Sequence, residues 1–272
     1  MKVLVTGGGG FLGGAIVRML QARGDEVTVV ARGDYPALVA AGVRLHRGDL
    51  ADAAAVDAAF AGQDVVIHAA AKPGVWGPYE DFHRSNVLAT RVVLDACRKH
   101  GVSRLVYTSS PSVVFDAGDH QDASNDLPYP GSYLAFYPQT KAEAEREVLA
   151  ANGPTLATVS LRPHLIWGPG DPNLLPRLID RARRGRLRIV GDGKNKVSLT
   201  YIDNAAVAHL QAADRLAPGV SWAGKAYFVN DPEPVVLWEW INQLLGRLDV
   251  PQVKGSISPA LARTVGGIAE GV

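Results

Sequence analysis

The stretch TGGGGFLG at residues 6–13 directly follows the apolar run VLV. A glycine-rich turn between a buried strand and a helix is suited to hold a pyrophosphate. Gly7 permits the tight bend, Gly10 lets the backbone approach the phosphates, and Gly13 lets the helix pack closely on the strand. The helix expected from residue 11 to about residue 23 directs its free N–H groups and positive dipole end at the anion. A flexible glycine loop is the alternative, and the flanking strand and helix argue against it.

The first 110 residues alternate strands and helices. The strands are expected at KVLVT, EVTVVAR, VRLHRGD, DVVIHAAA and SRLVYTSS. They are nearly continuous in apolar character, as parallel strands covered on both faces should be. Helices are expected at residues 11–23, about 52–61 and about 80–100. This repetition predicts an α/β protein with a doubly wound parallel sheet, the Rossmann fold.

The pattern loosens in the second half of the chain. A loop over 116–133 precedes a helix that contains Tyr137 and a buried strand at 156–161. A helix is then expected at 173–184, short strands near 187–190 and 226–229, and a further helix from about Leu237. We therefore predict a dinucleotide-binding domain over residues 1–162. A smaller irregular substrate lobe over 163–272 is interleaved with it and wraps back onto the sheet.

A second motif, YPQTK at residues 137–141, completes a chemical constellation. On a helix, Tyr137 and Lys141 share a face one turn apart. The expected strand before this helix ends in Ser109 and Ser110. Ser, Tyr and Lys in this order, after an N-terminal dinucleotide fold, are typical of hydride-transfer enzymes. A Tyr-x-x-x-Lys pair alone occurs often by chance as an exposed surface pair, so the glycines and the serine carry the prediction.

The composition limits the size of the fold and the kinds of partner and compartment to be expected. The chain has 272 residues, 47% of them hydrophobic, enough for a well-buried core in one large domain or one domain plus a small lobe. A net charge of +1 gives no reason to expect nucleic acid or an acidic membrane surface. The single cysteine, Cys97, excludes an internal disulfide and suits a reducing cytosol, so we expect a cytoplasmic protein.

Further features narrow the function. No signal peptide is expected before the first strand, and no apolar run reaches the ~18 residues that span a bilayer. No group of His, Cys and acidic residues has metal-ligand spacing, so we expect no metal. The basic run RARRGRLR at 181–188 is either a solvated helix end or a surface that faces cofactor phosphates or an anionic substrate. His68, at the end of a core strand, is expected to be structural.

The end of the second strand indicates the preferred cofactor. NAD-binding folds usually place Asp or Glu there to bind the ribose 2′-hydroxyl, whereas NADP-binding folds need a cation. Here the strand ends in Ala31 and Arg32, whose guanidinium can bind a 2′-phosphate, and Asp34 is two residues further on. We therefore predict NADP(H) rather than NAD(H), with a solvated loop cation as the alternative for Arg32.

Taken together, these residues resemble the extended short-chain dehydrogenase/reductases, in particular the 3β-hydroxysteroid dehydrogenase-like branch. The matching segments are TGGGGFLG (6–13), GDL (48–50), HAAA (68–71), NVLATRVVLDAC (86–97), VYTSSPSVVF (106–115), YPQTKAEAE (137–145), LRPHLIWGPGDP (161–172) and TYIDNAAVAHL (200–210). AAKPGVWGPYEDF, TSSPSVVFDAGD and RPHLIWGPGDP look most like bacterial 2-alkyl-3-oxoalkanoate reductases of long-chain olefin synthesis. They are also similar to sterol-4α-carboxylate 3-dehydrogenases.

The resemblance implies roles for individual residues. Tyr137 is implied as the general acid/base, Lys141 as the ligand of the ribose hydroxyls, and Ser110 as the donor to the reacting oxygen, with Ser109 and Ser112 as alternative serines. The residues expected to contact the cofactor are Gly7, Gly10, Phe11, Leu12, Gly13, Arg32, Asp49, Leu50, Ala69, Ala70, Ala71, Lys72, Asn86, Tyr137, Lys141, Pro163, Leu165 and Ile166.

The expected reaction is the NADPH-dependent reduction of a 2-alkyl-3-oxoalkanoic acid to the 3-hydroxy acid. Lys141, with the oxidised nicotinamide, is expected to lower the pKa of the Tyr137 phenol. Ser112, Trp76 and His164 are candidate substrate contacts. A carboxylate head group would need a cation or donor, for which the candidates are His164, Lys72 and Arg84. Five tryptophans, expected in the lobe, suit a lipid chain or are ordinary core residues: Trp76, Trp167, Trp222, Trp238 and Trp240.

Three other functions stay open. A 3β-hydroxysteroid or sterol-4-carboxylate 3-dehydrogenase shares the chemistry. A nucleotide-sugar epimerase or dehydratase shares the Ser-Tyr-Lys triad and would need several cations for the substrate pyrophosphate, for which the run at 181–188 is a candidate. A non-catalytic dinucleotide sensor commonly lacks the tyrosine or the lysine, and both are present here.

The resemblance also bears on assembly. Relatives often dimerise through two helices per subunit, so we expect a homodimer through the helices at 86–97 and 137–151, and assembly with other enzymes of an olefin pathway. Members of this branch usually run on for several dozen more residues, so a C-terminal truncation after Val272 is expected. A membrane-contacting tail would belong to that missing part.

Overall fold

The computed structural model describes residues 1–74, 76–262 and 264. Within it the chain forms two compact units. The first unit consists of residues 1–164 and 202–229, and the second begins with residues 165–201 and resumes at residue 230. The final stretch of the predicted lobe, residues 265–272, lies outside the described residues.

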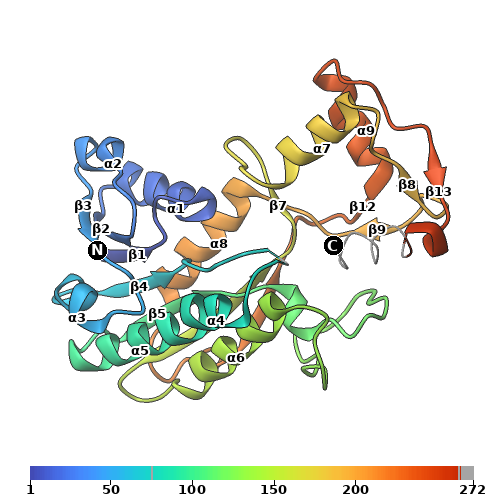
Figure 1. Cartoon of the computed structure of the whole chain (residues 1–272). Helices are drawn as coiled ribbons and strands as arrows, with labels where there is room; N and C mark the ends of the chain where they lie inside the picture. The colour runs from blue at the N-terminus through green and yellow to red at the C-terminus, as the bar shows by residue number, and fades with distance from the viewer. Residues whose placement is uncertain (75, 263, 265–272) are drawn as a thin grey trace. The chain divides into compact units, whose positions relative to one another are not determined.

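The first unit is built on a parallel sheet of seven strands in the order β11-β6-β5-β4-β1-β2-β3 (Figure 1). Its strands are β1 (Lys2–Thr6), β2 (Glu26–Ala31), β3 (Arg44–Arg47), β4 (Val65–His68), β5 (Arg104–Thr108), β6 (Ala157–Pro163) and β11 (Ala226–Val229). From β1 the chain winds outward to β2 and β3, then returns to wind the other way from β4. The predicted doubly wound α/β fold is therefore confirmed. In such sheets ligands bind outside the carboxyl ends of the strands where the winding reverses, here between β1 and β4.

Helices cover both faces of this sheet (Figure 1). They are α1 (Phe11–Ala22), α2 (Pro36–Ala40), α3 (Ala53–Val56), α4 (Tyr79–Phe82), α5 (Ala89–Lys99), α6 (Phe136–Ala150) and α8 (Ile202–Arg215). Helix α1 packs against α8, and α5 packs against α6. Short 3-10 turns at Asp57–Phe60 and Pro111–Val114 continue α3 and follow β5.

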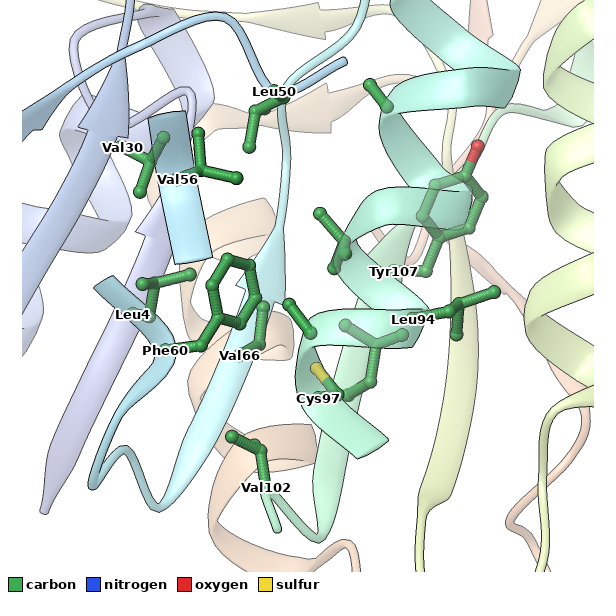
Figure 2. Close-up of a cluster of buried hydrophobic side chains, with 14 of the residues drawn as sticks. Leu4, Val30, Leu50, Val56, Phe60, Val66, Leu94, Cys97, Val102 and Tyr107 are labelled. Carbon is green, nitrogen blue, oxygen red and sulfur yellow. The ribbon is translucent and has the colours of Figure 1, made fainter. Parts of the chain in front are cut away.

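The core on the α5 side of the sheet is a continuous apolar cluster, shown in Figure 2. Leu4 and Val66 from the strands meet Phe60 from the 3-10 turn and Cys97 from α5. Cys97 is a free thiol in this cluster, and burial raises its pKa to about 12. The cysteine is therefore a packing residue rather than a reactive one.

The helix expected over 80–100 has an irregular centre. The segment His83–Leu88, between α4 and α5, is a π-helical turn, and Asn86 in it is 1% exposed. The extent of the helix was predicted correctly, but apolar spacing does not report a change of pitch inside a helix. Such π-helical turns occur frequently at functional sites because they redirect a side chain.

The second unit has its own small core. Its elements are β7 (Ile166–Trp167), α7 (Leu174–Arg183), β8 (Ile189–Val190), β9 (Lys196–Val197), β10 (Thr200–Tyr201), β12 (Val235–Val236), α9 (Leu237–Arg247) and β13 (Ser256–Ile257). The short strands form three pairs, β7 with β10, β8 with β13 and β9 with β12. Trp167 meets Tyr201 and Trp240 edge-on, with ring centroids 5.2 and 5.1 Å away.

The chain returns to the first unit between the two parts of the second. Residues 202–229, expected within the lobe, supply α8 against α1 and β11 beside β6. The sequence predicted that the lobe wraps back onto the sheet but did not locate this segment. The segment TYIDNAAVAHL at 200–210 matches the family motif, but the sequence predicted no helix there.

Helix α8 attaches to the sheet through a buried histidine. His209 is 0% exposed, its Nδ1–H donates to the Ala205 carbonyl at 2.7 Å, and its Nε2 accepts from the Thr108 hydroxyl at 2.8 Å. Burial lowers the pKa of His209 to about 4. The folded protein therefore keeps this imidazole neutral.

We expect the free energy of unfolding to fall less steeply with decreasing pH in His209→Gln than in wild type. As pH falls from 6.5 towards 4, His209 of the unfolded chain takes up a proton that the folded protein excludes, so wild-type stability falls. One proton corresponds to up to about 1.4 kcal/mol per pH unit, and the variant lacks this contribution. Glutamine still offers an oxygen to the Thr108 hydroxyl. Urea unfolding across this range measures the slope, and parallel curves would contradict the neutral histidine.

Candidate active site

The glycine-rich turn between β1 and α1 is closely packed against its own backbone. Gly7 has φ +69°, a conformation that side chains disfavour. A Cβ on Gly13 would lie 2.2 Å from the Gly7 carbonyl oxygen, and one on Gly7 would lie 2.9 Å from Cα of Ala70. The turn is therefore sterically restricted to glycine at both positions, and it contacts the chain that follows β4.

The N-terminus of α1 is open to an anion. Gly10 precedes the helix without a capping side chain, and the first turn has no acidic residue. The first N–H groups of a helix, here those of Phe11, Leu12 and Gly13, have no intrahelical partner. A Cβ on Gly10 would lie 3.2 Å from the Gly7 oxygen, so the backbone stays bare at this point. These features fit a pyrophosphate.

The ends of β2 and β3 place opposite charges near each other. Arg32, exposed after β2, is close enough for its charge to contribute to lowering the pKa of Asp49. The largest contributions come from the Ala51 N–H, which donates to Asp49 at 3.0 Å, and from Arg84, which donates at 2.8 Å. Arg84 thus forms an ion pair with Asp49, a residue predicted to contact the cofactor. The Tyr35 ring, which no sequence motif indicated, occupies the space where a Cβ on Gly9 would lie.

A buried chain of hydrogen bonds runs beneath the turn. His68 Nδ1 accepts from the Thr6 hydroxyl at 2.7 Å, and its Nε2–H donates to the Thr90 hydroxyl at 3.0 Å. The Thr90 hydroxyl donates its hydrogen bond to the Asn86 carbonyl oxygen at 2.6 Å. Thr90 must therefore accept from His68, which assigns the ring proton of the histidine to Nε2. Burial lowers the pKa of His68 to about 3, and the charge of Lys141 adds to this.

Asn86 connects the segment after β4 to α6. Its Oδ1 accepts from the backbone N–H of Lys72 at 2.8 Å, and its Nδ2 donates to Thr140 Oγ1 at 3.0 Å. The Lys72 ammonium pairs with Asp81 at 2.6 Å. Two of the three candidates for a carboxylate head group, Lys72 and Arg84, therefore already have acidic partners.

Ser110 and Tyr137 meet at the carboxyl end of β5. The Ser110 side chain is close enough to the Tyr137 phenol to contribute to lowering its pKa, and its hydroxyl lies 2.9 Å from Ser112 Oγ. Ser109 is buried instead, and its hydroxyl has no hydrogen-bond partner among the described residues. The three serines left open by the sequence are thus separated: Ser110 lies beside the tyrosine, and Ser112 contacts Ser110.

Lys141 lies one turn after Tyr137 on α6 and is 2% exposed. Its ammonium donates to the Thr108 carbonyl at 2.7 Å and lies 4.1 Å from the centre of the Tyr107 ring. Burial lowers the pKa of Lys141 to about 7, against an opposing effect of Glu145. The lysine can therefore exchange a proton near neutral pH.

The expectation that Lys141, together with an oxidised nicotinamide, lowers the pKa of Tyr137 stays a prediction. Burial raises the pKa of the phenol, and only the hydrogen bond from Ser110 opposes that rise. The physical reason is desolvation, which disfavours the phenolate. At neutral pH the phenol keeps its proton and acts as a donor.

Glu145 forms a buried network that sequence reasoning missed. It is 0% exposed and accepts from Arg162 at 2.6 Å, from Ser160 at 2.6 Å and from the Tyr129 hydroxyl at 2.7 Å. Burial raises the pKa of Glu145, but the hydrogen bonds from Arg162 and Ser160 more than offset this and leave it lowered. The acidic residue four positions after Lys141 was the available signal.

The remaining candidates are distributed over both units. Ala69–Ala71 follow β4, and Leu50 is buried after β3. Pro163 ends β6, and the His164 N–H donates to the Val229 carbonyl.

Leu165, with φ +42°, and Ile166 begin the second unit. Trp76 and Trp222 belong to the first unit rather than to the lobe, which corrects that expectation. In the basic run at 181–188, Arg184 pairs with Asp180.

The described residues contain neither a metal-ligand cluster nor a membrane-spanning helix. Within residues 1–74, 76–262 and 264, no group of three or more His, Cys, Asp or Glu side chains is arranged to hold a metal ion. In the same part of the chain no helix has the length and apolar character needed to cross a bilayer. That no metal takes part stays a prediction.

Known proteins resemble the chain over most of its length. A family model described as the 3-beta hydroxysteroid dehydrogenase/isomerase family matches residues 4–258. A 2-alkyl-3-oxoalkanoate reductase of Stenotrophomonas maltophilia is 53% identical over 272 residues, 99% of this chain and 82% of that protein. The decarboxylating sterol-4-alpha-carboxylate 3-dehydrogenase of Mus musculus is 37% identical over 254 residues, 91% of this chain and 69% of that protein.

A solved structure shares the fold. The UDP-glucose 4-epimerase of Thermus thermophilus, in complex with NAD, has a TM-score of 0.77 to this chain at 28% identity. The similarity covers 98% of this chain and 93% of that one.

We expect Gly13→Ala to disrupt the turn, because its methyl group would overlap the Gly7 carbonyl. Overpacking of this kind typically lowers stability by about 1–3 kcal/mol, and affinity for NADPH should fall with it. Gly14→Ala is the matched control, since its Cβ would meet nothing nearer than 3.6 Å and alanine favours a helix. Melting temperature and fluorescence titration with NADPH measure both effects. Equal behaviour of the two variants would contradict the close packing.

Proposed function

Because the chain belongs to the 3-beta hydroxysteroid dehydrogenase/isomerase family, we propose that it is an NADPH-dependent reductase of 2-alkyl-3-oxoalkanoic acids. The product is the 3-hydroxy acid. The observation that carries this proposal is the 53% identity, over 272 residues, with a 2-alkyl-3-oxoalkanoate reductase. The resemblance predicted from the motifs is confirmed by the family match, and the chain is accordingly an NAD(P)-dependent oxidoreductase.

The residues present fit a nicotinamide dinucleotide. Gly7, Gly10 and Gly13 leave the backbone bare where a pyrophosphate would approach, and the uncapped α1 offers N–H donors. Arg32 lies after β2, where a 2′-phosphate would be bound, which supports NADP(H) over NAD(H). Tyr137 and Lys141 would hold the ribose and nicotinamide half. When bound, the cofactor supplies the hydride to the carbonyl carbon.

Three side chains take part in the proton transfer that accompanies the reduction. Tyr137, protonated because burial raises its pKa, gives its proton to the substrate oxygen as negative charge develops there. Ser110 donates a hydrogen bond to the same oxygen and so stabilises that charge. Lys141, with its pKa of about 7, lies one turn away and returns a proton to the Tyr137 oxygen.

A second function has specific support. The 37% identity with a sterol-4-alpha-carboxylate 3-dehydrogenase favours oxidation of a sterol alcohol as the runner-up. The nucleotide-sugar epimerase or dehydratase and the non-catalytic sensor stay open as alternatives. Side-by-side assays of NADPH consumption with branched β-keto acids and UDP-sugars, and of steroid oxidation, separate these functions.

The cytoplasmic location, the homodimer and the assembly with other olefin-pathway enzymes stay predictions. Helices α5 and α6, expected to form the dimer contact, are joined within the chain by Arg91, which pairs with Glu147 at 2.6 Å and Glu143 at 3.3 Å. A dimer through these helices would have to accommodate this ion pair.

We expect Tyr137→Phe to lower kcat by about 10²–10⁴-fold while NADPH affinity stays near the wild-type value, because only the proton donor is removed. Ser110→Ala should also lower kcat, whereas the neighbouring Ser109→Ala serves as its control, because the buried Ser109 hydroxyl has no hydrogen-bond partner among the described residues. Steady-state rates with a 2-alkyl-3-oxo acid and titration with NADPH measure the two effects. Near-normal turnover of Tyr137→Phe with bound cofactor would refute the catalytic assignment.

We expect Arg32→Ala to raise KM for NADPH by roughly tenfold and to leave KM for NADH nearly unchanged, because a guanidinium binds the 2′-phosphate that only NADPH carries. Arg98→Ala, an exposed arginine of α5, is the matched control. Initial rates at varied concentrations of each cofactor measure the ratio. An equal change with both cofactors would remove Arg32 from cofactor selection.

A further inference from the structure

Four large apolar side chains of the first unit are unusually exposed. Trp76, Phe115, Leu134 and Phe136 are 63%, 49%, 86% and 42% exposed, and we call them the apolar rim. Among the described residues, the Trp, Phe and Tyr side chains in the exposed class are Trp76, Phe115 and Phe136, all of them in the rim. Contiguous exposed apolar groups of this kind usually mark a binding surface.

The rim lies on segments that carry the catalytic candidates. Phe136 directly precedes Tyr137 at the start of α6, and Phe115 ends the short turn that Ser110 begins. Phe115 and Phe136 are therefore within a few residues of Ser110 and Tyr137, and Leu134 comes three residues before Tyr137, whereas Trp76 precedes α4.

Contacts join these segments to one another. The Tyr133 hydroxyl, next to Leu134, donates to the Val113 carbonyl at 3.2 Å, which ties the Leu134 loop to the turn before Phe115. The Phe136 ring meets Tyr79 edge-on at 5.5 Å, which ties it to the helix that follows Trp76. These contacts join the segments that carry the rim, two of which also carry Ser110 and Tyr137.

Resting on the function proposed above, we propose that the apolar rim binds the hydrocarbon chain of the substrate and sets its chain-length preference. With the oxygen at C3 held by Ser110 and Tyr137, the alkyl groups on C2 and C3 must extend away from that point. The rim residues border this point and offer apolar surface to those chains. The related enzymes are named for an alkyl-substituted acid and a sterol, both with large hydrocarbon parts.

The first experiment compares a long-chain with a short-chain 2-alkyl-3-hydroxy acid, oxidised with NADP⁺ because these acids are stable. Wild type should prefer the long acid. In Leu134→Ala the ratio of kcat/KM for the long acid over the short acid should fall about fivefold, since less apolar surface is buried. Leu248→Ala, at a residue of the second unit that is 45% exposed, is the matched control and should keep the wild-type ratio. An unchanged ratio in Leu134→Ala would overturn the proposal.

A second measurement does not depend on turnover. A long-chain 2-alkyl alkanoic acid without the 3-oxygen is titrated calorimetrically into the NADPH-loaded protein. Weaker binding to Leu134→Ala and Phe136→Ala than to wild type and Leu248→Ala supports the rim. Equal binding to all four overturns it.

These results separate the rim from the proposed function. If no 2-alkyl acid is oxidised but the acid binds as described, the proposed reaction fails and the rim remains as a hydrocarbon site. If the acids react with no loss of the ratio or of binding in the rim variants, the reaction stands and the rim proposal fails. Sedimentation that shows a dimer split by Leu134→Ala would assign the rim to a second copy of the chain and would also overturn it.

Discussion

Helix α6 carries two ionisable side chains, Lys141 and Glu145, into the interior one turn apart, and the site depends on how they are paired. Lys141 bonds to the end of β5, and Glu145 accepts from Arg162 and Ser160 on β6. An uncompensated buried charge costs several kcal/mol, so α6 is held to one position against these strands. That position also sets Tyr137 beside Ser110.

The reversal of the winding direction between β1 and β4 explains how segments distant in the sequence lie at one edge of the sheet. Because β1, β4 and β5 are neighbours, the glycine-rich turn, Ala70 and Ser110 all follow strand ends at the same edge. The turn touches Ala70 directly, and the hydrogen bonds from Thr6 through His68 and Thr90 continue to Asn86. The glycine-rich turn and the segment that carries Asn86 are therefore connected through the buried interior.

The chemistry of the site is divided between a polar centre and an apolar border. Ser110, Tyr137 and Lys141 supply donors and a titratable amine, and exposed apolar side chains, Phe115 and Phe136 among them, lie on the same segments as Ser110 and Tyr137. This arrangement suits a carbonyl attached to hydrocarbon better than a sugar phosphate, whose recognition calls for several cations. It agrees with the family, whose related members are named for an alkyl acid and a sterol.

The sequence alone determined the sheet, most of its strands and the close-packed glycine-rich turn, because Gly spacing and apolar runs are local signals. Tyr137 and Lys141 could be paired from the sequence for the same reason, because residues four apart share one face of a helix. Only the tertiary structure decided which serine meets Tyr137, and that α8 and β11 complete the first unit. It also decided that Arg162 holds Glu145 and that burial raises the Tyr137 pKa. These depend on contacts between distant segments and on exclusion of water, which no local pattern encodes.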